Sequence, residues 1–254
     1  MTMTTTSFAT PLATAAGEVL GVVFGTVARL RADRPLHPQG ATYAGTVTMT
    51  GHGASGVPWL DRPARHEVTV RVSRAVGLPR WAPDVYGIAL RASVIGERPA
   101  DLLFASTGDT VGGRMMFRPR RGAGTGPLTT LLPVRSSNGP LVLRLLATAP
   151  APAPEGEEDL TPPRTMALAY AHGTGPWRQC GALRVGARLG QVTEEERHDP
   201  VLNPLPGTQQ YPVVRALREP SYRAARAAPV GGPAARRTAP DASRSTPASA
   251  RSRP

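Results

Sequence analysis

Hydrophobic and polar residues alternate along two stretches near the start of the chain. In ATYAGTVTMTG (residues 41–51), every second residue is apolar or small, and threonines fill most positions between them. In HEVTVRVSR (66–74), three valines share one face, while Thr69, Arg71 and Ser73 share the other. A period of two is typical of β-strands, whose successive side chains point to opposite faces. Both stretches are therefore predicted to be strands.

Five further runs of strand-like composition follow, separated by turn residues. They are YGIALRASVI (86–95), ADLLFAS (100–106), PLVLRLLATA (140–149), RTMALAYAHG (164–173) and WRQCGALRVGARL (177–189). Since no long helical pattern lies between them, consecutive strands are expected to pair antiparallel. The predicted fold class is mainly β: a closed antiparallel β-barrel of about eight strands, with an N-terminal helix and C-terminal helices packed outside it.

Two segments have helical patterns. Residues 15–32 form an amphipathic pattern that ends in RLRA, where arginines favour the negative end of the helix dipole. We expect this helix to dock on the barrel; a helix lying on a membrane surface is the alternative. The segment YPVVRALREPSYRAARAA (211–228) is the second, and Pro220 is expected to begin a fresh helical turn.

Composition shifts divide the chain into segments. Residues 1–14 are predicted to be frayed, 15–226 to form the barrel domain with its flanking helices, and 227–254 to be a disordered tail rich in arginine, proline and alanine. Within the domain, TAPAPAPEGEEDLTPP (148–163) is predicted to be a flexible proline-rich and acidic loop.

Half of the net charge of +12 comes from the C-terminal end of the chain. All 30 basic residues are arginine, and residues 223–254 hold seven of them against a single aspartate. Because this segment lacks interleaved aromatic residues, no specific nucleic-acid recognition is expected. The one cysteine, Cys180, excludes an internal disulfide, and no run is long and apolar enough to span a membrane. Together these features favour a cytoplasmic location.

Two pairs of residues carry candidate chemistry. Arg71 and Ser73 share a strand face, and an arginine that points inward needs a carboxylate or an anionic ligand to offset its desolvation. Arg218 lies four residues before Tyr222, so both fall near one face of a helix. A guanidinium beside a phenol favours the phenolate. This second pair is either an ordinary surface contact or a phenolate prepared to bind a metal.

Five short stretches together resemble the catalase superfamily. They are RPLHPQG (34–40), VRVS (70–73), PDVYGIALR (83–91), ADLLFAST (100–107) and REPSY (218–222). Their order and spacing follow the family, and the likeness extends from about residue 30 to 226. The phrases GVPWLD, SRAVGLPR, NPLPG and LREPSYRAARA also resemble a group of small actinobacterial proteins that often carry a phosphodiesterase label.

The resemblance implies roles for two residues on the distal side of a heme. His37 corresponds to the family's distal histidine, the general acid–base that transfers a peroxide proton. Ser73 corresponds to the serine that hydrogen-bonds to that imidazole and orients it.

The resemblance also implies that heme b is the cofactor. Arg34 and Arg71 match arginines that pair with the heme propionates. Tyr222 matches the tyrosine that ligates the iron, and Arg218 matches the guanidinium that keeps this tyrosine ionised.

One position departs from the family pattern. Ala105 stands where the family has an asparagine whose amide helps to hold peroxide over the iron. This loss argues against rapid peroxide disproportionation.

Three functions remain open at this point. The first is a heme-binding, catalase-like protein acting as a weak peroxidase or as a peroxide-dependent oxidase of a small organic substrate. The alternative is a heme-free catalase-fold binding or scaffold protein, and the third is a phosphoester hydrolase. A homodimer is compatible with each of them.

Overall fold

A computed structural model of the protein describes residues 40–51, 53–75, 77–79, 81–93, 98–149, 160–191 and 198–227. The predicted N-terminal helix at 15–32, most of the predicted flexible loop and most of the tail lie outside these residues.

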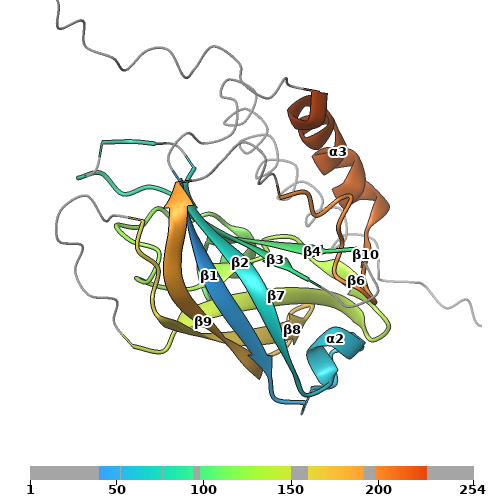
Figure 1. Cartoon of the computed structure of the whole chain (residues 1–254). Coiled ribbons are helices and arrows are strands. Elements are labelled where there is room, and N and C mark those ends of the chain that lie inside the picture. Colours follow the sequence, from blue (N-terminus) through green and yellow to red (C-terminus); the bar gives the residue numbers. More distant parts are fainter. Residues whose placement is uncertain are drawn as a thin grey trace, which may run out of the picture.

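The described chain is mainly β-structure (Figure 1). The strands are β1 (Gly40–Met49), β2 (Ala64–Arg74), β3 (Tyr86–Ala92), β4 (Ala100–Ser106), β5 (Leu128–Thr129), β6 (Val134–Ser136), β7 (Gly139–Ala147), β8 (Thr165–His172), β9 (Arg178–Gln191) and β10 (Gln209–Gln210). The helical segments are α2 (Pro58–Asp61), the short 3-10 turn η1 (Gly113–Met115) and α3 (Pro212–Ala227).

Eight of these strands close into an antiparallel barrel. Their order is β7-β5-β4-β3-β2-β1-β9-β8, and a further pairing of β8 with β7 completes the circle. The short strands β6 and β10 extend the sheet beside β7. The predicted closed barrel of about eight strands is thus confirmed.

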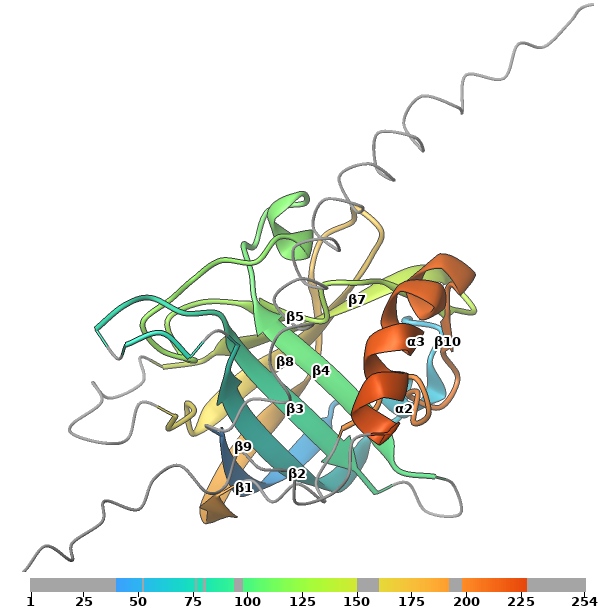
Figure 2. The same ribbon diagram turned by 90° about the horizontal axis from the view of Figure 1, so that it is seen from above.

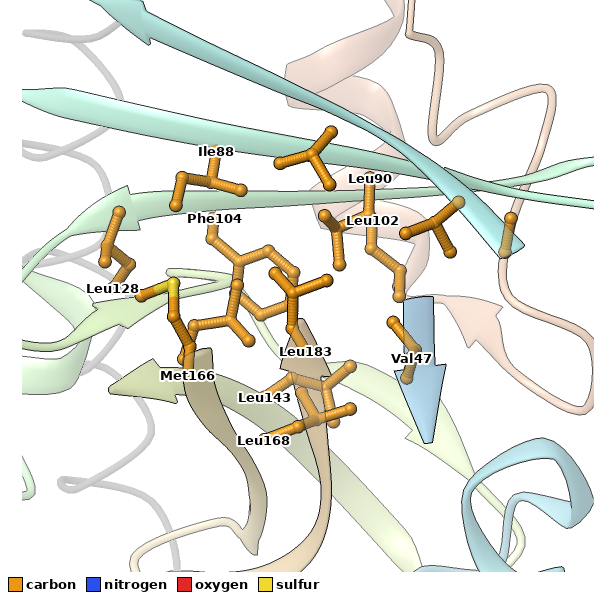
Figure 3. Close-up of a cluster of buried hydrophobic side chains, with 14 of the residues drawn as sticks. Val47, Ile88, Leu90, Leu102, Phe104, Leu128, Leu143, Met166, Leu168 and Leu183 are labelled. Carbon is orange, nitrogen blue, oxygen red and sulfur yellow. The ribbon is translucent and has the colours of Figure 1, made fainter. Parts of the chain in front are cut away.

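Apolar side chains fill the barrel interior (Figure 3). Ile88, Phe104, Leu143 and Leu168 come from four different strands, and each is almost inaccessible to solvent. Burying an aliphatic or aromatic side chain of this size stabilises a protein by roughly 1.5–3 kcal/mol. The alternating sequence pattern therefore has its physical basis here, because alternate residues of β2, β3 and β4 enter this core.

Helix α3 lies outside the barrel, beside β4 and β10 (Figures 1 and 2). A C-terminal helix packed outside the barrel was expected, but the expectation for Pro220 was wrong. Instead of beginning a new turn, Pro220 lies inside one continuous helix. The helix tolerates it at the cost of the hydrogen bond that a proline nitrogen cannot donate.

Candidate functional site

The outer surface of β2 carries two of the residues that the resemblance singles out. Val68, Val70 and Val72 are buried in the core, whereas the alternate residues Arg71 and Ser73 are only half-buried. Arg71 therefore points away from the hydrophobic core. The idea that it points into the barrel was wrong, because the sequence pattern separates two faces without saying which one is inside.

Strand register places Ser73 in a row of small residues. Ser73 pairs with Gly40 on β1 and with Gly87 on β3, and Gly87 in turn pairs with Ala105 on β4. Because residues in register across a sheet share one face, these four positions form a continuous line on the outside of the barrel. We call this line the small-residue row.

Arg71 lies in the next row of the same outer face. It pairs with Thr42 on β1 and Ala89 on β3, and Ala89 pairs with Leu103 on β4. The guanidinium thus rises from a surface whose β3 neighbours are a glycine and an alanine. A flat ligand that covered both rows would meet Ser73 and Arg71 as the polar groups from β2.

Gly87 keeps the surface of the small-residue row flat, because no side chain projects from it. A Cβ atom at this position would stand 3.2 Å from the Ser73 Oγ atom and 3.7 Å from the Phe104 carbonyl oxygen. The first distance is tight, so a larger residue would press on the Ser73 hydroxyl. Glycine at this position therefore leaves the hydroxyl accessible from the side of β3.

Helix α3 presents Arg218 and Tyr222 on the same stripe as its buried residue Val214. Val214, Arg218 and Tyr222 follow one another at intervals of four, so they lie on one side of the helix. Val214 is buried with Leu131 and Leu132, whereas Arg218 and Tyr222 are half-buried. The expected arrangement of these two residues on one helix face is therefore present.

Figure 2 relates the helix to the two rows. The strands β2, β3 and β4 lie in front in this view, and α3 lies beside β4. His37 and Arg34 lie outside the described residues, so their predicted roles remain predictions, as do those of Ser73, Arg71, Arg218 and Tyr222.

A buried carboxylate ties the segment that precedes α3 to the barrel. Asp101 on β4 accepts two hydrogen bonds from Arg91, from Nε at 2.8 Å and from Nη2 at 2.9 Å. It also accepts the backbone N–H of Asp199 at 2.7 Å and the side-chain amide of Asn203 at 2.8 Å. The chain that leads to β10 and α3 is thereby held against the outside of β4.

The ionised form of Asp101 is favoured by these donors. Burial by itself raises the pKa of the Asp101 carboxyl, but the hydrogen bonds from Arg91, Asn203 and Asp199 outweigh it and hold the pKa below its ordinary value. Sequence analysis missed this anchor, because it depends on the Arg91–Asp101 register of β3 and β4.

Other features of the described residues do not add to this site. An open pocket of about 400 Å³ near β6 and β10 is lined by Arg135, Ser136, Ser137, Gly207, Thr208 and Gln209, none of which belongs to the two rows. The described residues contain no group of three or more His, Cys, Asp or Glu side chains that could hold a metal ion. No helix among them is long and apolar enough to cross a membrane.

The sequence matches no protein-family model, and no curated protein is significantly similar to it. Solved structures do match in fold. A fungal catalase superposes with a TM-score of 0.52 at 12% identity, over 79% of this chain and 61% of the catalase. A bacterial catalase superposes with a TM-score of 0.50 at 12% identity, over 78% of this chain and 58% of the catalase.

The chain spans less than two thirds of the length of these catalases. At this level of identity the likeness concerns the path of the backbone and not the side chains. The closed eight-stranded barrel and these superpositions together show that the protein has a catalase-like fold.

Proposed function

We propose that the protein binds heme b between the outer face of β1–β4 and helix α3, and that it acts as a weak peroxidase or peroxide-dependent oxidase. The observation that carries this proposal is the register of the outer face. It aligns Ser73 with Gly87 and Ala105 and puts Arg71 in the adjacent row, on the side of the barrel where α3 lies.

The residues present fit such a cofactor in three respects. The small-residue row is low enough for a planar ring to approach, because Gly87 carries no side chain. Arg71 supplies a cation suited to a propionate. Tyr222 supplies an oxygen donor on the stripe of α3 that also carries the buried Val214, with Arg218 one turn before it, and a phenolate is an established axial ligand of heme iron.

Each residue then has a definite task. Bound heme would supply the iron that activates peroxide. Arg71, with Arg34, would hold the propionates, and Tyr222 would bind the metal while Arg218 favours its ionised form. The Ser73 hydroxyl would orient the His37 imidazole, which would take the proton from one peroxide oxygen and return it to the other.

Ala105 supports a peroxidase or oxidase rather than a rapid catalase. It occupies the row position next to Gly87 with a methyl group, where the catalase pattern has an amide. A methyl group donates no hydrogen bond to peroxide, and it leaves apolar space for an organic substrate. Replacement of Ala105 by asparagine should therefore raise the ratio of peroxide disproportionation to organic oxidation.

Heme titration of the full chain, followed by the Soret absorption, tests the proposal. Tyr222→Phe should weaken heme binding by roughly tenfold or more, because it removes the anionic ligand. Tyr211→Phe is the matched control, since it makes the same change at the residue immediately before α3. It should bind heme within about twofold of the parent.

Two outcomes would count against the proposal in different ways. If Tyr222→Phe binds heme as well as the parent, Tyr222 is not the ligand and the alignment of REPSY is wrong. If the parent binds no heme after reconstitution, the heme-free binding or scaffold protein becomes the better hypothesis. The phosphoester hydrolase hypothesis stays a prediction, which hydrolysis of bis(p-nitrophenyl) phosphate tests directly.

A further inference from the structure

The described residues of the loop between β2 and β3, which are 75, 77–79 and 81–85, project beyond the barrel strands in both views (Figures 1 and 2). The loop carries the most exposed of the large hydrophobic side chains that the structure describes. Trp81 is 79% exposed and Leu78 is 41% exposed. Contact of these two apolar side chains with water is energetically unfavourable, and the folding of the loop does not require it. Their exposure therefore points to a binding role.

The backbone of this loop is held in place by a buried ion pair. Arg74 Nε lies 3.4 Å from Asp84 Oδ2, and both side chains are at most 3% exposed. The Asp84 carboxylate also accepts the backbone N–H groups of Gly77 at 2.8 Å, Leu78 at 3.1 Å and Val85 at 2.7 Å. The loop is therefore organised around Asp84, and Trp81 projects from a constrained backbone.

The surroundings of the loop are strongly basic. A β-bridge joins Asp84 to Arg120, with backbone hydrogen bonds of 2.8 Å in both directions. Arg118 and Arg121 flank this bridge and are exposed. Between residues 75 and 85 and between 110 and 127, the sequence contains one acidic residue, Asp84, which is the buried partner of Arg74.

We infer that the loop is a membrane-docking element that inserts Trp81 and Leu78 into the interface of an anionic lipid bilayer. Tryptophan is enriched at the boundary between headgroups and acyl chains, where its amphipathic ring is best accommodated. The exposed arginines of the segment bridged to this loop, Arg118 and Arg121, would meet the negative surface of such a bilayer.

A second copy of the chain fits the loop less well. A stable protein interface buries about 800 Å² on each partner, and a narrow loop with one tryptophan and one leucine offers only a part of that area. Attachment to a bilayer needs far less buried area, because lipid molecules rearrange around each inserted side chain. The arginines add electrostatic attraction to the anionic headgroups.

Vesicle co-sedimentation of the full chain tests the inference. The parent should bind vesicles of phosphatidylcholine with phosphatidylglycerol and should bind pure phosphatidylcholine vesicles much more weakly. Trp81→Ala should lower the partition coefficient for the anionic vesicles by roughly tenfold or more. The double variant Arg118→Gln/Arg121→Gln should lower this coefficient by roughly thirtyfold. Added salt should weaken binding of the parent to a similar extent, because it screens the same attraction.

Leu202→Ser is the matched control, because Leu202 is 50% exposed and belongs to another segment, the one between β9 and β10. It should bind the anionic vesicles as the parent does. Tryptophan emission of the parent should shift to the blue on binding, and Trp81→Ala should lose this shift. If Trp81→Ala binds as tightly as the parent, or the parent ignores anionic vesicles, the inference is wrong. In the first case the attraction comes from the arginines of the chain without insertion of the loop.

Discussion

Asp101 offers the sharpest test of how the barrel holds the segment that leads to α3. Its side chain is 0% exposed, and its two oxygens accept four hydrogen bonds. The Asp101→Asn variant keeps the shape but turns one acceptor into a donor. With its NH2 group in the place of Oδ1, which accepts only the Arg91 Nε bond, it loses that one hydrogen bond and leaves Arg91 without its buried counter-ion. Removing one partner of a buried ion pair costs roughly 3–5 kcal/mol, which is the loss predicted here.

Partial hydration moves this prediction to the lower end of the range. The side chain of Arg91 is 28% exposed, so water can replace some of the hydrogen bonding that it loses with the Asp101 carboxylate. We therefore expect the free energy of unfolding to fall by about 3 kcal/mol, measured by urea denaturation at neutral pH. Asp109→Asn is the control, because Asp109 pairs with Arg144 while its own side chain is 49% exposed. Its cost should be no more than about 1 kcal/mol.

The pH dependence gives an independent check. The pKa of Asp101 is lower in the folded protein than its ordinary value, so its stabilising contribution is complete above that ordinary value. The contribution is lost as the pH falls through the folded-state pKa. The gap in stability between the parent and Asp101→Asn should consequently shrink on acidification. A cost below about 0.5 kcal/mol at neutral pH, or a gap that widens in acid, would refute the reasoning.

Four further experiments, three of them on altered proteins, test other parts of the molecule. Burial, together with the charge of Asp61, raises the pKa of the Cys180 thiol to about 12. The thiol should therefore resist Ellman's reagent at pH 8 until denaturant is added. Rapid labelling of the native protein would contradict its burial. Leu168→Ala should lower the free energy of unfolding by about 2–5 kcal/mol in urea, because the side chain is 0% exposed, and a smaller loss would mean that the core collapses around the gap. In Gly45→Ala the new Cβ would lie 2.6 Å from Val70 Cγ2, so a cost of about 1–3 kcal/mol is expected in the same assay, and no cost would show that β1 shifts freely. Truncation after Ala227 should leave the thermal midpoint unchanged, whereas a drop of several degrees would show that the tail docks.

Much of the fold could be predicted from local patterns. The alternation in HEVTVRVSR determined that Arg71 and Ser73 share a face, since the period of a strand is two whatever lies beside it. The number of such runs, with turn residues between them, was enough to predict a closed antiparallel barrel. The interval of four between Arg218 and Tyr222 likewise determined that they share one side of a helix.

Tertiary structure decided what these faces meet. Whether Arg71 points into the core depends on which face of β2 the barrel encloses, and that depends on all eight strands together. The neighbours of Ser73 depend on register with β1 and β3, which cross-strand packing sets and no local signal encodes. The same holds for Asp101, whose partners Asp199 and Asn203 lie 98 and 102 residues further along the chain. Local periodicity thus determined orientation along each strand, whereas long-range packing alone decided which side chains share a surface.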